Sequence, residues 1–66
     1  MEQGIDDLLV AIEIYPQDAY YHYHLGLMYA DTAETDLSRL HLEKAIQLGL
    51  DPDSEKNAQA ILSASD

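Results

Sequence analysis

The stretch "AYYHYHLGLMYAD", residues 19–31, decides the fold, because four tyrosines and two histidines crowd around a single glycine in it. Its alternating tyrosines and histidines would suit a half-buried strand, since tyrosine favours strands. No hairpin signal flanks the run, however, and the next apolar positions follow helical spacing. One helix face, at i, i+3, i+4 and i+7, contains His22, Leu25, Gly26 and Tyr29. The stretch therefore predicts a helix.

Two prolines divide the rest of the chain into further helical segments. Pro16 and Pro52 end helices because proline removes a hydrogen-bond donor and clashes with the preceding turn. The sequence predicts an all-α fold with helices over residues 4–14, 19–31, 36–48 and 53–64.

Three polar residues are expected to cap these helices. Asp18 and Thr35 precede the second and third helices, where a side-chain oxygen can accept from free backbone N–H groups. Asp51 is expected to do the same for the last helix, with Pro52 as its first residue.

The chain contains an internal repeat. "LLVAIEIYP" aligns with "HLEKAIQLGLDP" at a spacing of 34 residues, which is the period of helix–turn–helix repeats that stack into solenoids. The equivalent pairs are Leu8 and Leu42, Ala11 and Ala45, Ile12 and Ile46, and Ile14 and Leu48.

The residues between the two copies resemble the tetratricopeptide repeat (TPR) family over nearly the whole chain. The matching positions are Leu25-Gly26 with Tyr29 in the first helix, Ser38, Leu42 and Ala45 in the second, and the closing Pro16. The chain departs from the family pattern at His22, Ala33, Pro52 and Leu62. Sel1-like repeats are a weaker match, because their longer inter-helix loop is missing.

The resemblance implies a fragment of a TPR-like α-solenoid in a single domain, residues 1–66. In this reading residues 4–16 are the second helix of an incomplete repeat, 18–50 are one complete repeat, and 51–66 are a capping helix. Gly26 would let the helix over 36–48 approach closely, since glycine within a helix otherwise costs about 1 kcal/mol relative to alanine.

The resemblance also implies a protein-binding groove. The concave side of such an array would be lined by Tyr20, Tyr23, His24, Leu27 and Asp31. Family members that bind carboxylate-terminated chaperone tails present lysine and asparagine there, and this chain does not. The expected partner is a peptide or helix with apolar anchors, flanked by Lys or Arg.

A second reading is self-association. The first helix is apolar nearly all round, and solenoids usually need three or more repeats for stability. A homodimer, or a piece of a longer array, is therefore expected to use Ile5, Leu8, Leu9, Ile12, Leu37 and Leu40.

The charge of the chain excludes some classes of function. Its 66 residues contain 13 Asp and Glu against 3 Lys and Arg, a formal net charge of −10. Nucleic acids and anionic membrane surfaces both need a basic patch, so neither is an expected partner. The acidity serves solubility, adaptation to high salt or the binding of a basic partner. No signal peptide or spanning segment is seen, so the expected location is the cytoplasm.

Nothing in the sequence predicts catalysis, a metal or a cofactor. The chain has no cysteine, which excludes a thiolate site or nucleophile. His22 and His24 are two residues apart, so a helix directs them to opposite sides, whereas zinc-binding helices use i, i+4 pairs. No arrangement of Ser, His and Asp and no phosphate-binding glycine loop is present, so an enzyme is not expected.

Overall fold

The computed structural model describes residues 4–64, and this part of the chain contains four helices and no strand. They are α1 (Ile5–Ile14), α2 (Ala19–Asp31), α3 (Thr35–Leu48) and α4 (Pro52–Ala64). Each boundary lies within one residue of the one expected from the sequence, so the all-α prediction is confirmed. The ends of the expected domain, residues 1–3 and 65–66, lie outside the described residues.

Two of the three expected helix caps form. Asp18 Oδ1 accepts from the backbone N–H groups of Tyr20 at 2.9 Å and Tyr21 at 3.3 Å. Asp51 Oδ2 accepts from the N–H of Ser54 at 3.1 Å, and Pro52 is the first residue of α4. Both acidic caps satisfy N–H groups that a helix start leaves free.

The expected Thr35 cap is wrong, because Thr35 is already the first residue of α3 and Glu34 precedes it without a side-chain cap. The reason is the tightness of the α2–α3 turn. Ala33 has a left-handed backbone with φ 62°, and the N–H of Glu34 closes back on the Tyr29 carbonyl at 2.8 Å. This closure, typical of helix C-termini, leaves no room for a further residue before α3.

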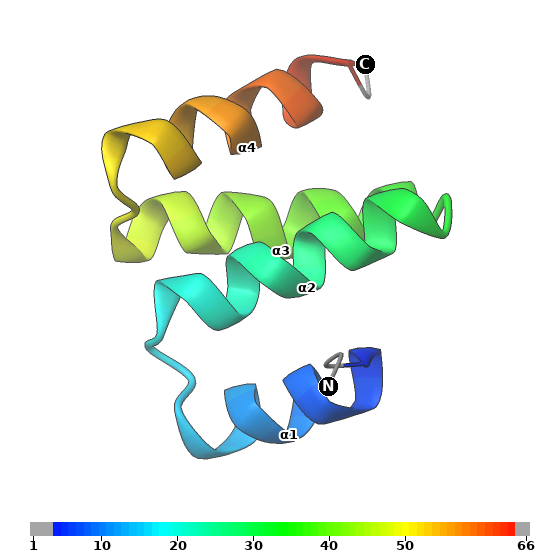
Figure 1. The fold of residues 1–66 in the computed structure, drawn as a ribbon, viewed down its shortest axis with the longest axis vertical. Helices are drawn as coiled ribbons and strands as arrows, with labels where there is room; N and C mark the ends of the chain where they lie inside the picture. The colour runs from blue at the N-terminus through cyan, green and yellow to red at the C-terminus, as the bar shows by residue number, and fades with distance from the viewer. Residues whose placement is uncertain (1–3, 65–66) are drawn as a thin grey trace.

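The helices follow one another in space as they do in the sequence (Figure 1). α2 and α3 run antiparallel and form the largest helix–helix contact, as a short connection favours. α1 packs on α2, while α4 packs mainly on α3 and also touches α2. Among the described residues, α1 therefore has α2 as its only helical neighbour.

The contact between α2 and α3 centres on Gly26. A Cβ atom placed on Gly26 would lie 2.6 Å from Leu42 Cγ and 3.2 Å from the Leu42 backbone nitrogen, so only glycine fits without a shift. The Gly26 carbonyl also accepts a hydrogen bond from the buried Ser38 hydroxyl at 2.8 Å. The expected packing of Gly26 on Leu42 is confirmed. Further fully buried side chains belong to Leu8, Leu25, Ala45 and Ala58.

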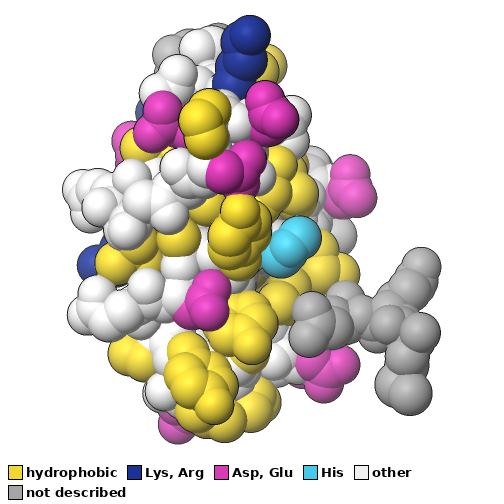
Figure 2. Space-filling model, turned by 60° about the vertical axis from the view of Figure 1, so that its left-hand side comes forward, with side chains coloured by type: hydrophobic (Ala, Val, Ile, Leu, Met, Phe, Trp, Pro, Cys, Tyr) yellow, Lys and Arg dark blue, Asp and Glu magenta, His cyan; other side chains and the backbone are white. Residues whose placement is uncertain are grey.

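The surface charge is uneven along the molecule. Figure 2 shows Asp and Glu side chains over the whole of one face, while Lys and Arg are confined to its upper and middle parts. The sequence explains this, because residues 1–38 contain eight Asp and Glu and no basic residue, and all three cations begin at Arg39. The α1–α2 half of the fold is therefore uniformly acidic. None of the helices described is both long and apolar enough to cross a bilayer.

Candidate functional site

The groove expected on α2 is partly closed by α4. Tyr23 is only 8% exposed and belongs to the buried cluster with Leu42, Ala45 and Ala58. Its hydroxyl oxygen accepts a 2.7 Å hydrogen bond from the Asn57 side-chain amide of α4. The prediction that Tyr23 lines an open groove is therefore wrong, because α4 covers it.

The prediction that Leu27 lines an open groove is wrong for the same reason. Leu27 lies one turn beyond Tyr23 on α2 and packs, partly buried, against the same cluster as Ile61 and Leu62 of α4. Like Tyr23, it contributes to the core under α4 and does not form the floor of an open groove.

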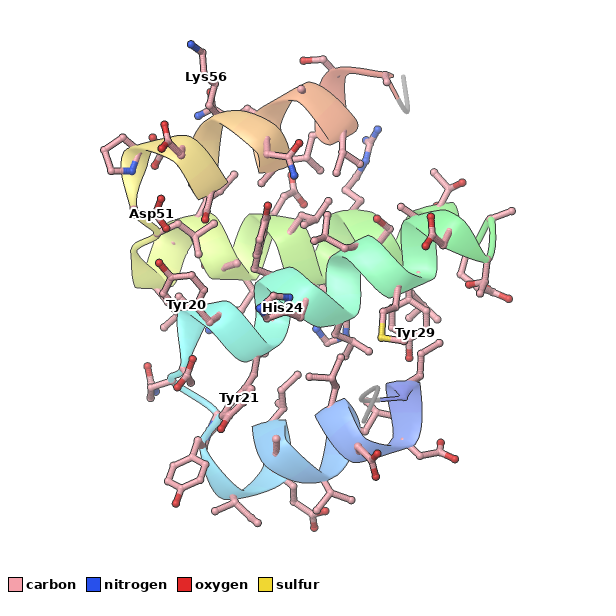
Figure 3. All side chains as sticks on the ribbon, viewed as in Figure 1. Tyr20, Tyr21, His24, Tyr29, Asp51 and Lys56 are labelled. Atoms are coloured by element: carbon pink, nitrogen blue, oxygen red, sulfur yellow. The ribbon has the colours of Figure 1, made fainter. Side chains whose placement is uncertain are left out.

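Three residues of the expected groove remain exposed: Tyr20, His24 and Asp31. Tyr20 donates its hydroxyl hydrogen to Asp51 Oδ1 at the start of α4, and Figure 3 shows the two side chains facing each other. The Tyr20 and His24 rings lie side by side, with centroids 6.4 Å apart. Asp31 is at the opposite end of α2, so it does not join this pair.

The hydrogen bond between Tyr20 and Asp51 shifts the pKa of both side chains. It is the largest cause of the raised pKa of Tyr20, which is further raised by desolvation and by the Asp51 charge. The same bond, followed by bonds from Ser54, lowers the pKa of Asp51 to about 2. Asp51 thus joins the start of α2 to the start of α4, which is a structural role.

A histidine pair that sequence reasoning did not find joins α2 to α3. His22 Nδ1 lies 3.1 Å from His41 Nδ1, and His22 Nε2 lies 3.0 Å from the Pro16 carbonyl oxygen. A carbonyl only accepts, so Nε2 of His22 donates to Pro16, whereas the direction of the Nδ1–Nδ1 hydrogen bond depends on the tautomers of the two rings. The two rings stack 5.4 Å apart, and His41 also stacks on Tyr29.

This pair is explained by packing. His22 is 6% exposed, and the pKa of His41 is lowered by desolvation first and by His22 second. No three potential metal ligands come together anywhere in residues 4–64. The sequence signal for the pair is weak, since the two residues are 19 apart and lie on different helices.

The self-association residues of α1 also need one correction. Leu8 is fully buried against the rest of the chain, so the prediction that it contacts a second chain is wrong. Ile5 and Ile12 are half-buried, and Leu9 is exposed. On α3, Leu37 and Leu40 are exposed as expected; whether they contact another chain stays a prediction.

Another exposed apolar surface lies on the side of α1 opposite the buried Leu8. It is called here the α1 outer face and consists of Val10 and Ile14, with the exposed Tyr15 at its C-terminal end. Sequence reasoning found the first helix apolar nearly all round but did not place Val10 or Ile14 in a site. The apolar character of both sides of α1 was the signal in the sequence. When a single neighbouring helix covers one side of such a helix, its other apolar side stays exposed.

An open depression adjoins the α1 outer face at its C-terminal end. It is lined by Ile14, Tyr15, Pro16, Gln17 and Asp18. The depression forms because α1 ends at Ile14, shortly before Pro16, and the chain turns into the Asp18 cap of α2. It could receive one apolar side chain from another molecule beside the exposed ring of Tyr15.

Comparisons of the chain with protein-family models, with curated proteins and with solved structures each found no match.

Proposed function

We propose that the protein is a non-enzymatic protein–protein interaction module, and that it binds its partner through the α1 outer face. One observation carries this proposal. Val10 and Ile14 are 55% and 62% exposed on a helix whose only described helical neighbour is α2. A helix with apolar residues on two sides and packing on one leaves an apolar surface that water disfavours.

The finer fold proposal is a TPR-like unit with α4 as its capping helix. The 34-residue spacing supports it, since Leu8 and Leu42 are both buried on α1 and α3. Tyr23 and Asn57, also 34 residues apart, meet across α2 and α4. In such an array, α1 would be the second helix of a repeat, and the α1 outer face would be available for packing by a further helix.

The groove first expected on α2 is the less supported surface. Its central residue, Tyr23, and its neighbour Leu27 already pack against α4. The exposed Tyr20 has a hydrogen-bond partner within the chain in Asp51. The α1 outer face exposes more apolar side chain than this groove does. It is therefore the better supported binding surface.

The test is selection of binding peptides from a random display library, with no bias in charge. We expect enriched peptides that bind the wild type and lose binding to the Ile14→Ser variant. Leu40→Ser is a matched control. Leu40 is 59% exposed on α3, and the substitution is the same kind of aliphatic-to-polar change. No enrichment, or peptides indifferent to Ile14→Ser, would contradict the proposal.

A further inference from the structure

The α1 outer face is apolar at its centre and acidic around it. On a helix, the neighbours of a residue are the side chains three and four positions away. For Val10 these are Asp6, Asp7, Glu13 and Ile14. All three acids are exposed, so the ridge of Val10 and Ile14 is bordered by carboxylates.

Within residues 4–38 no Lys or Arg balances these carboxylates, because the first such residue is Arg39, and α1 does not pack on α3 or α4 among the described helices. The first-turn acids Asp6 and Asp7 suit the positive end of the helix dipole. Glu13 lies in the last turn, where a negative charge is disfavoured and no basic residue is present. A cation brought in beside Glu13 would therefore be stabilised by both the carboxylate and the helix end.

A symmetric dimer through two α1 outer faces would not supply the positive charge that the surface needs. Two α1 outer faces brought together would oppose Asp6, Asp7 and Glu13 to the same residues. Their repulsion would come on top of a formal charge of −10 on each chain. The surface instead fits a partner whose charged border is positive.

The shape of the surface suggests a helix as the partner. Val10 and Ile14 form a ridge at i, i+4, the kind of ridge that packs into the groove of another helix. A peptide that binds by adding a β-strand would need a free sheet edge, and the described part of the chain contains no strand. The depression beside Tyr15 offers a place for one larger apolar side chain at the end of the ridge.

We propose that the α1 outer face docks a basic amphipathic helix of another protein. Its aliphatic residues would cover Val10 and Ile14, and its Lys or Arg side chains would pair with the flanking Asp6, Asp7 and Glu13. This inference rests on the proposed function and adds the chemistry of the partner.

The experiment uses three designed peptides, each about 18 residues long so that a helix can form on binding. They share one leucine face and differ in the polar face, which is Lys, Gln or Glu. A fourth peptide has the composition of the Lys peptide in a scrambled, non-amphipathic order. Binding to the whole chain is measured by fluorescence anisotropy at low and high salt.

At low salt we expect the Lys peptide to bind about tenfold more tightly than the Gln peptide, from a few rim ion pairs. The Glu and scrambled peptides should bind more weakly still. High salt should reduce the advantage of the Lys peptide, because screening weakens exposed ion pairs. Glu13→Gln should weaken the Lys peptide and leave the Gln peptide unchanged.

Variants separate this inference from the proposed function. Ile14→Ser should weaken the Lys peptide and Leu40→Ser should not. If the Gln or Glu peptide binds as tightly as the Lys peptide and still depends on Ile14, the partner chemistry is wrong and the interaction function stands. If the scrambled peptide matches the Lys peptide, or the Lys peptide does not bind, the basic helix is also overturned. If no peptide binding responds to Ile14→Ser, both proposals fail.

Discussion

Gly26 is the residue at which α2 and α3 approach most closely, and we predict that Gly26→Ala destabilises the fold. Alanine would gain helix propensity, but its Cβ would lie 2.6 Å from the Cγ of the fully buried Leu42. Overpacking of this kind costs about 1–3 kcal/mol. The free energy of unfolding is measured by urea denaturation followed by circular dichroism.

Gly4→Ala is the control for Gly26→Ala, because no atom lies within 4 Å of a Cβ placed on Gly4. Gly4 is the N-cap of α1, where alanine is less favourable than glycine, so we expect a loss below about 1 kcal/mol. Equal effects of the two substitutions would show that Gly26 is not needed for the close approach.

Ala33 is the one non-glycine residue in residues 4–64 with a positive φ, 62°. The left-handed region costs an L-residue about 1–2 kcal/mol, while glycine loses more entropy on folding. Ala33→Gly should therefore stabilise the fold by roughly 0.5–1 kcal/mol. Ala30→Gly, within the last turn of α2, should instead destabilise it by about 1 kcal/mol. A lower melting temperature for Ala33→Gly would contradict the turn geometry.

At the scale of elements, the docking of α4 depends on the hydrogen bond from Asn57 to Tyr23. Tyr23→Phe removes the acceptor and keeps the ring, so we expect a loss of about 1 kcal/mol. Faster hydrogen exchange should follow in α4. Asn57→Ala should have a similar effect, and the double variant should lose little more, since both remove the same bond. Fully additive losses would mean that the two side chains do not interact.

The helices were predictable because their signals are local. Pro16, Pro52, Asp18 and Asp51 act within one turn of where they stand, and the helix boundaries were accordingly correct to within one residue. Thr35 was the exception, since the left-handed Ala33 shortens the turn before it.

The candidate site was harder to predict, because it depends on which side of each helix a distant helix covers. Nothing local in α2 reveals that α4 crosses over Tyr23, so the expected groove was placed on a buried residue. Leu8 and Val10 are both apolar and two residues apart. Only the position of α2 decides that Leu8 is buried and Val10 exposed.

At the scale of the whole molecule, we expect stability to depend on pH through the lowered pKa of His41. The pKa of His41 is lowered from 6.5 in the folded chain, first by desolvation and then by His22. Below 6.5 the unfolded chain therefore binds a proton that the folded chain resists. The contribution of His41 is complete above 6.5 and is lost as the pH falls through the lowered folded value.

We therefore predict that the urea midpoint falls between about pH 7 and about pH 5, within the histidine range. His41→Gln should flatten this dependence, and the control His24→Gln, on the exposed side of α2, should not. The Asp51 contribution does not overlap, because it is present above 3.8 and is lost as the pH falls through about 2. A midpoint independent of pH in the histidine range would contradict the described pairing.

The central claim is that the α1 outer face is the binding surface, and amide hydrogen exchange of the whole chain tests it most directly. Exchange is compared with and without the Lys-faced amphipathic peptide, since a docked helix slows local opening of the element it covers. We predict added protection in α1 and in residues 15–18, with α3 and α4 unchanged. Protection confined to the Tyr20–His24 side of α2 and the start of α4, or no change in α1, would contradict the claim.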